Sequence, residues 1–191
     1  CGAARLPGPI APTAWALPTG GSVMSGAVVI NSPSPSTLQI DQVSPAASIS
    51  WSGFTVGAAE TVTVFQPAST SGAIFSVTGS TAAIDGMLNS TGNLVLSNPS
   101  GTTFGTSASV NVGGLLGTSL APTSYSGDAS GITSVELALP TALVRSAMLN
   151  YGSIQAAQQG AVALVGTNAY NAGIIRANGG RISLVAADSV S

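Results

Sequence analysis

The chain has 191 residues, and only 5% of them are Asp, Glu, Lys or Arg, whereas a typical soluble domain carries about 25% charged residues. Its four arginines are scattered and cannot form the basic surface that neutralises phosphates, so we expect no nucleic-acid partner. The chain has no histidine and its six acidic residues are dispersed, so the sequence indicates no enzyme, no metal site and no cofactor.

The remaining composition favours one folded all-β domain. The chain is 45% hydrophobic and contains 24 glycines. No stretch approaches the ~20 uninterrupted apolar residues of a membrane-spanning helix. Small polar residues alternate with Val, Ile, Leu and Ala, which is typical of strands and turns. Disordered chains are poor in apolar residues and rich in charge, unlike this one.

Residues 1–16 are expected to be a flexible leader. Cys1 is the only cysteine, so no disulfide can form within the chain. Three interpretations stay open for this segment. Cys1 is a lipidated residue, Ala14-Trp15-Ala16 marks the end of a signal peptide, or the segment is a plain leader or cloning remnant.

Residues 17–191 are predicted to form the domain, and its first part is expected to be a cap. GGSVMSGAVVI (20–30) and the proline-containing NSPSPSTLQI (31–40) are interpreted as strands that cover the first coil of a solenoid and hide its edges. Further strands are predicted at TVTVF (61–65), GNLVLS (92–97) and SVNVGGL (109–115), separated by clusters of turn residues.

The segment from about 121 to 147 interrupts this pattern. Its Gly, Ser, Asp and Pro residues predict a hairpin or loop packed outside the solenoid. ALVRSAML (142–149) has the composition of either a short helix or a strand, and we favour a strand that leads into the regular coils of residues 148–188.

An internal repeat provides the clearest indication of the fold. NYGSIQAAQQGAVALVG, from Asn150, aligns with NAGIIRANGGRISLVAA, from Asn171. A repeat of about 20 residues with two short strands predicts a parallel β-helix in which each repeat is one coil. Leucine-rich repeats share this period but need a regular leucine pattern that is missing. Asn150 and Asn171 are expected to stack at coil corners. The chain stops at Ser191 within a repeat, so we expect it to be a fragment.

Several segments in order resemble one family, the two-partner-secretion or filamentous-haemagglutinin N-terminal domain. They are LPTGGSVMSG (17–26), ISWSGFTVGAAETVTVFQP (49–67), VTGSTAAIDGMLNSTGNLVLSNPSGTTFG (77–105) and SVNVGGLLGTSL (109–120). The repeat and the resemblance together predict an all-β, right-handed parallel β-helix with an N-terminal β cap and an extra-helical hairpin or loop.

The resemblance also marks candidate functional residues. The family turn reads Asn-Pro-Asn-Gly, and this chain has Asn98, Pro99, Ser100 and Gly101, which we interpret as a structural turn or a transporter-recognition motif. A second departure from the family lies before Val77, where relatives commonly carry Asn-Arg and this chain has Phe75-Ser76.

Two aromatic residues, Trp51 and Phe54, fall in another matching segment. We interpret them as core or cap residues, and the alternative is an exposed platform for sugars.

The function implied by the resemblance is secretion. The domain would be the N-terminal secretion signal and folding nucleus of a large adhesin-like surface protein, exported by the Sec route through the periplasm to the exterior or the cell surface. Its partner would be an outer-membrane β-barrel transporter with periplasmic POTRA domains. Two alternatives stay open: an adhesin module that binds carbohydrates or host surfaces, and a β-helix enzyme acting on polysaccharides, which the dispersed acids disfavour.

Overall fold

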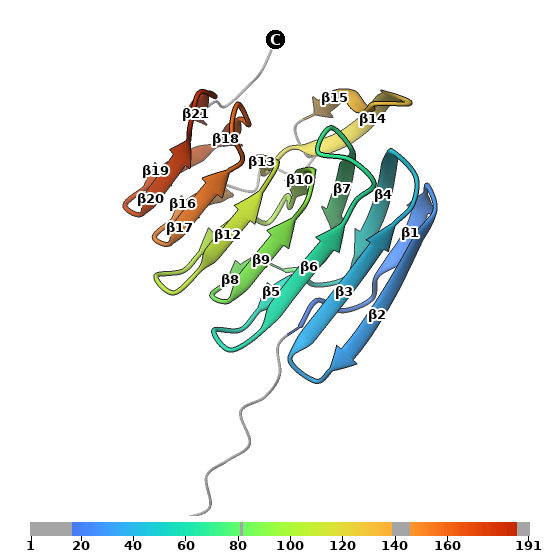
Figure 1. The fold of residues 1–191 in the computed structure, drawn as a ribbon. Coiled ribbons are helices and arrows are strands. Elements are labelled where there is room, and N and C mark those ends of the chain that lie inside the picture. Colours follow the sequence, from blue (N-terminus) through green and yellow to red (C-terminus); the bar gives the residue numbers. More distant parts are fainter. Residues whose placement is uncertain (1–16, 81, 139–145, 187–191) are drawn as a thin grey trace, which may run out of the picture.

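The computed structural model describes residues 17–80, 82–138 and 146–186, and three sheets form the faces of a solenoid (Figure 1). Sheet I contains, in spatial order, β1 (Ser22–Ser25), β4 (Ala46–Trp51), β7 (Gly72–Val77), β10 (Asn93–Ser97), β13 (Gly114–Thr118), β18 (Val162–Gly166) and β21 (Ile182–Ala186). Sheet II contains β2 (Val28–Ser34), β3 (Thr37–Gln42), β6 (Thr61–Phe65), β9 (Met87–Ser90), β12 (Ser109–Val112), β17 (Ser153–Ala156) and β20 (Ile174–Ala177). Sheet III contains β19 (Asn168–Asn171), β16 (Ala147–Asn150), β11 (Thr102–Phe104), β8 (Ala82–Ile84) and β5 (Thr55–Val56).

A full coil takes one strand from each sheet, as β6, β7 and β8 show, and the last coil has only β20 and β21 within the described residues. Successive coils pair in parallel within all three sheets, for example β7 with β10 and β10 with β13. The parallel β-helix predicted from the sequence is therefore confirmed. No helix in the described part of the chain is long and apolar enough to cross a membrane.

The core fills the space between the three sheets. Strand residues alternate between the interior and the outer face, so Val62 and Val64 of β6 are fully buried while Thr61 and Thr63 are only half-buried. Stacking of coils places apolar residues above one another, as with Phe75 and Leu96 of sheet I. This one-dimensional packing explains how a chain rich in small residues still forms a continuous core.

Two antiparallel strands cap the N-terminal end of the solenoid. β1 pairs with β4 and β2 pairs with β3, whereas β3 and β4 both pair in parallel with the next coil. The cap predicted from residues 20–40 is thus shorter than expected. Residues 37–40 belong to the first coil, because their partner Thr61–Val64 runs parallel to them.

Residues that align in the two sequence repeats also pair with each other in neighbouring coils of the structure. Asn150 pairs with Asn171, Ile154 with Ile175 and Leu164 with Leu184 in neighbouring coils. The offset of 21 residues falls to 20 after the turn between β17 and β18, as the alignment of the two repeats predicts.

One predicted strand is wrong. SVNVGGL (109–115) is divided between β12 of sheet II and β13 of sheet I, with Gly113 at the corner. A Cβ atom on Gly113 would lie only 2.7 Å from the backbone carbonyl oxygen of Gly92 in the preceding coil. The sequence pair Gly113-Gly114 therefore marks a corner, where the chain stacks on the backbone of the preceding coil, rather than a strand interior.

The segment that interrupts the coils forms a hairpin outside the solenoid. β14 (Ala121–Asp128) and β15 (Gly131–Ala138) pair with each other in an antiparallel two-stranded sheet, and β15 packs against β7 (Figure 1). Residues 139–145, which include the first half of the helix-or-strand segment (142–149), lie outside the described residues. The end of that segment lies in strand β16 (Ala147–Asn150).

Candidate functional site

The turn from Asn98 to Gly101 joins β10 to β11 at a corner between sheets I and III. Strand β10 ends at Ser97 and β11 begins at Thr102, so the turn contains the four residues of the sequence motif and nothing else. Its backbone closes with a hydrogen bond from the Gly101 amide to the Asn98 carbonyl, 2.8 Å long. This is the geometry of a tight turn.

Asn98 holds the turn through its side chain. Its Oδ1 accepts a hydrogen bond from the Ser100 amide at 3.0 Å, and its Nδ2 donates to the carbonyl oxygens of Gly101 at 2.8 Å and Ser80 at 3.0 Å. The side chain is fully buried. Asn98 thus closes its own turn and ties it to the corner of the preceding coil, as an Asx turn would.

The other three positions of the turn also have identifiable roles. Gly101 has φ +94°, and a Cβ atom there would lie 2.8 Å from the carbonyl oxygen of Ala147 in the next coil. Only glycine fits this position without strain. Ser100, where the family has Asn, donates from its hydroxyl to the Gly79 carbonyl at 3.1 Å. Pro99 and Ser100 are half-buried and are the turn residues with the most exposed surface.

A cavity of about 240 Å³ lies beside the turn. Ser76, Val77, Ser97, Pro99 and Pro122 are among the residues that line it, so it lies between the turn and the base of the hairpin. No sequence motif indicates this cavity, because residues 76, 99 and 122 meet only through the coil stacking and the hairpin. Hydroxyls and apolar atoms line it, and it contains no ionisable group.

The candidate aromatic residues lie in the core. Trp51 and Phe54 are each 1% exposed and form a cluster with Phe75, with ring centroids 5.5 to 5.8 Å apart. In the folded domain, no ligand can reach the faces of these rings. They fill the first two coils and contribute to stability instead.

Asn150 and Asn171 stack at a coil corner. The Asn150 Nδ2 donates to the Asn171 Oδ1 at 2.6 Å, and the Asn150 Oδ1 accepts from the Gly152 amide at 3.2 Å. Asn150 is fully buried, whereas Asn171 is exposed in the last described coil. Both side chains also form hydrogen bonds with backbone groups of their own coil. The remaining candidate, Cys1, lies outside the described residues.

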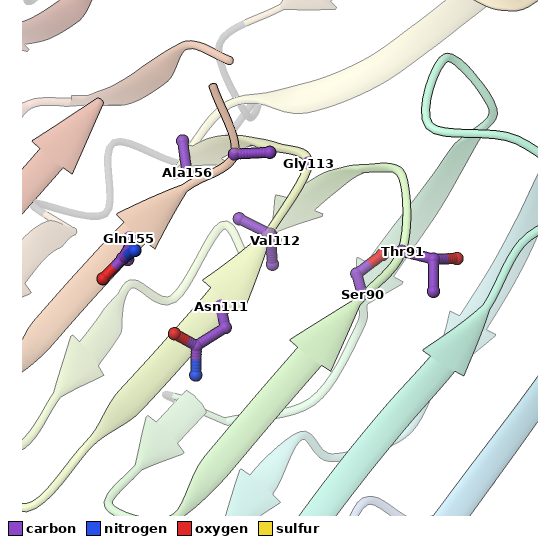
Figure 2. A pocket seen from close by; sticks show the side chains of 8 residues that line it. Ser90, Thr91, Asn111, Val112, Gly113, Gln155 and Ala156 are labelled. Atoms are coloured by element: carbon purple, nitrogen blue, oxygen red, sulfur yellow. The ribbon is translucent and has the colours of Figure 1, made fainter. Parts of the chain in front are cut away.

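A second pocket of about 240 Å³ lies over sheet II, and Figure 2 shows Asn111 and Gln155 side by side on its floor. The two residues occupy the same register of β12 and β17. Ser90 and Thr91 complete its polar lining. None of its lining residues is ionisable, so it provides no acid, base or activated nucleophile.

In the described part of the chain, no three acidic or cysteine side chains lie together. The arginines of the repeat, Arg176 and Arg181, are exposed on the last coil. The turn of residues 98–101 and the adjacent cavity are therefore the best-organised candidate site.

Comparisons with known proteins agree with this geometry. The family model described as "TPS secretion domain" matches residues 14–190. A heme/hemopexin-binding protein of Haemophilus influenzae is 36% identical over 103 residues, which are 53% of this chain and 11% of that protein. The crystal structure of the HMW1 secretion domain from Haemophilus influenzae superposes with a TM-score of 0.79 and 25% sequence identity, over 88% of this chain and 44% of that one.

Proposed function

The chain belongs to the TPS secretion domain family, and on that premise we propose that a partner outer-membrane transporter recognises it and exports the larger surface protein to which it belongs. The observation that carries the proposal is the match over residues 14–190 together with a well-formed turn at the family motif. The domain is a secretion domain rather than a catalytic one.

The length of the matching relative indicates how long the exported protein is compared with this domain. The chain spans only 11% of the heme/hemopexin-binding protein that it matches. In our proposal the remainder of the exported protein is the cargo, and this domain leads it across the outer membrane after Sec export into the periplasm. The periplasmic POTRA domains of the transporter provide the docking surface.

The architecture supports a role in folding as well. Each coil contacts mainly its neighbours, so coils can form one after another from the N-terminal end of the chain. The cap strands β1 and β2 cover the first coil, which gives the solenoid a defined starting end. Folding of the cargo outside the cell then makes export directional without an energy source at the outer membrane, whereas the domain itself is folded when the transporter contacts it.

The turn contributes to recognition through its outer side. Asn98 is fully buried and cannot contact a partner of the folded domain. Pro99 and Ser100 face the cavity that Ser76 also lines. We assign contact with the transporter to this cavity. Asn98 holds the turn in place, and with it the cavity-lining residues Pro99 and Ser100.

A binding measurement with the periplasmic domains of the cognate transporter tests this assignment. Ser76→Trp fills the cavity from the outer face of β7 and is expected to weaken binding at least about tenfold, which corresponds to about 1.4 kcal/mol. Ser109→Trp, on the outer face of sheet II, is the matched control and is expected to bind as the unmodified domain does. Equal binding by both variants contradicts the assignment to the cavity.

A further inference from the structure

We propose that the β14–β15 hairpin is a strap that docks on the first coils of the solenoid only after those coils have formed. It docks on a preformed apolar surface of sheet I and can open as a unit without unfolding the solenoid. The inference rests on the contacts of the hairpin and stands independently of the transporter.

The hairpin has one apolar and one polar face. Register pairs Tyr125 with Val135 and Pro122 with Leu137, and all four side chains are half-buried. Side chains on the opposite face are exposed: Thr123, Ser124, Ser126, Ser134 and Glu136. This alternation shows that one face of the hairpin is made to lie against another surface.

An apolar stripe lies on the outer face of sheet I, and β15 packs against its β7 end. Ile74, Val95 and Leu116 stand in register on β7, β10 and β13, and they point away from the core because their neighbours Phe75 and Leu94 point into it. Ile74 is nonetheless 1% exposed and Val95 8% exposed. Residues on an outer face are buried to this degree only when another part of the chain covers them.

Close contacts place the hairpin against the first two coils. A Cβ atom on Gly72 would lie 2.8 Å from the Ile132 Cδ1 atom, so Gly72 leaves a notch for this side chain. Gly131 has φ +135°, and a Cβ atom there would lie 2.2 Å from the Thr70 carbonyl oxygen. The Tyr125 hydroxyl is hydrogen-bonded to the Ser25 hydroxyl of cap strand β1.

These contacts run backward along the chain. The residues that contact the hairpin, from Ser25 of β1 to Gly72 of β7, all precede it in the chain, and the Tyr125–Ser25 bond spans 100 residues. In a chain that emerges from its N-terminus, the surface is complete before Ala121 arrives. The hairpin therefore fastens the cap to a later coil once those coils exist.

The hairpin is also separable from the solenoid. Its strands pair only with each other, so its opening breaks no hydrogen bond between coils. An isolated two-stranded hairpin is marginally stable at best in water. Docking thus provides the order of this segment, and its opening free energy is lower than that of the solenoid.

Hydrogen exchange of the purified full chain tests the proposal, read as peptides from residues 121–138 and 72–97. When the chain refolds out of urea, pulsed labelling is expected to show protection of 72–97 before 121–138. In the native state, Ile132→Ala is expected to accelerate exchange of 121–138 at least about tenfold and to leave 72–97 unchanged. Ser134→Ala, in the same strand on the exposed face, is the matched control.

A second variant addresses the receiving surface. Gly72→Ala narrows the notch for Ile132, and we expect it to accelerate exchange of the hairpin severalfold. Combined with Ile132→Ala it should add less than it does alone, because the Cδ1 and Cγ1 contacts at 2.8 and 2.9 Å are removed and only the Cβ contact at 3.1 Å remains. The proposal is overturned if residues 72–97 and 121–138 gain protection together, or if Ile132→Ala accelerates both segments equally.

Discussion

Replacement of Asn98 by alanine is the sharpest perturbation of the candidate site. The change removes three hydrogen bonds of 2.8 to 3.0 Å, made to Ser100, Gly101 and Ser80. Each has a net value of about 1 kcal/mol, and buried carbonyls left without a partner add to the loss. We therefore expect Asn98→Ala to lower the free energy of unfolding by about 3 kcal/mol.

Urea denaturation monitored by circular dichroism measures this loss. With a slope of about 2 kcal/mol per molar urea, the midpoint should fall by about 1.5 M. Asn93→Ala is the control, because Asn93 is exposed on the same coil and makes one long side-chain hydrogen bond of 3.3 Å. Its effect should stay below about 1 kcal/mol. Similar losses for the two variants would refute the view that Asn98 holds the corner together.

Three further predictions concern the core, the ladder and the hairpin. Phe75→Ala should cost about 3 to 5 kcal/mol in the same urea assay, because this fully buried ring packs against Trp51; a loss below about 1 kcal/mol would contradict this packing. Asn150→Ala should cost about 2 kcal/mol, since it leaves the Gly152 amide without its side-chain acceptor, and an unchanged urea midpoint would speak against the ladder. Hydrogen bonds from the Ser130 side chain and backbone lower the pKa of Asp128 below its ordinary 3.8. The stabilisation of the hairpin turn is thus present above pH 3.8 and is lost as the pH falls below that value through the pKa of the folded state. A titration of the Asp128 carboxyl chemical shift measures this pKa. Ser130→Ala should return the pKa of Asp128 toward 3.8.

The coil architecture could be predicted from the sequence because residues that pair in neighbouring coils of a solenoid are separated by one repeat length along the chain. Asn150 and Asn171 lie one coil apart in sequence and pair directly in space. The alternation in residues 61–65 likewise gave the bounds of β6. Local patterns were sufficient wherever the three-dimensional neighbour is also the neighbour in the repeat.

The remaining features depend on contacts that no local pattern contains. Gly113 lies at the corner between β12 and β13, where it stacks on the Gly92 backbone of the preceding coil, so the corner was mistaken for a strand interior. The motif identified Asn98 but not its burial, and burial decides whether it can touch a partner. The notch at Gly72 for Ile132 joins residues that are 60 positions apart and have no common motif.

Secretion with a partner tests the central claim most directly. The domain, joined to the rest of its exported protein, is expressed with and without the cognate outer-membrane transporter, and the protein is measured in the medium and in the periplasm. The account predicts protein in the medium or on the cell surface only when the transporter and residues 17–186 are both present. Protein retained in the periplasm despite a functional transporter, or equal export without residues 17–186, would contradict it.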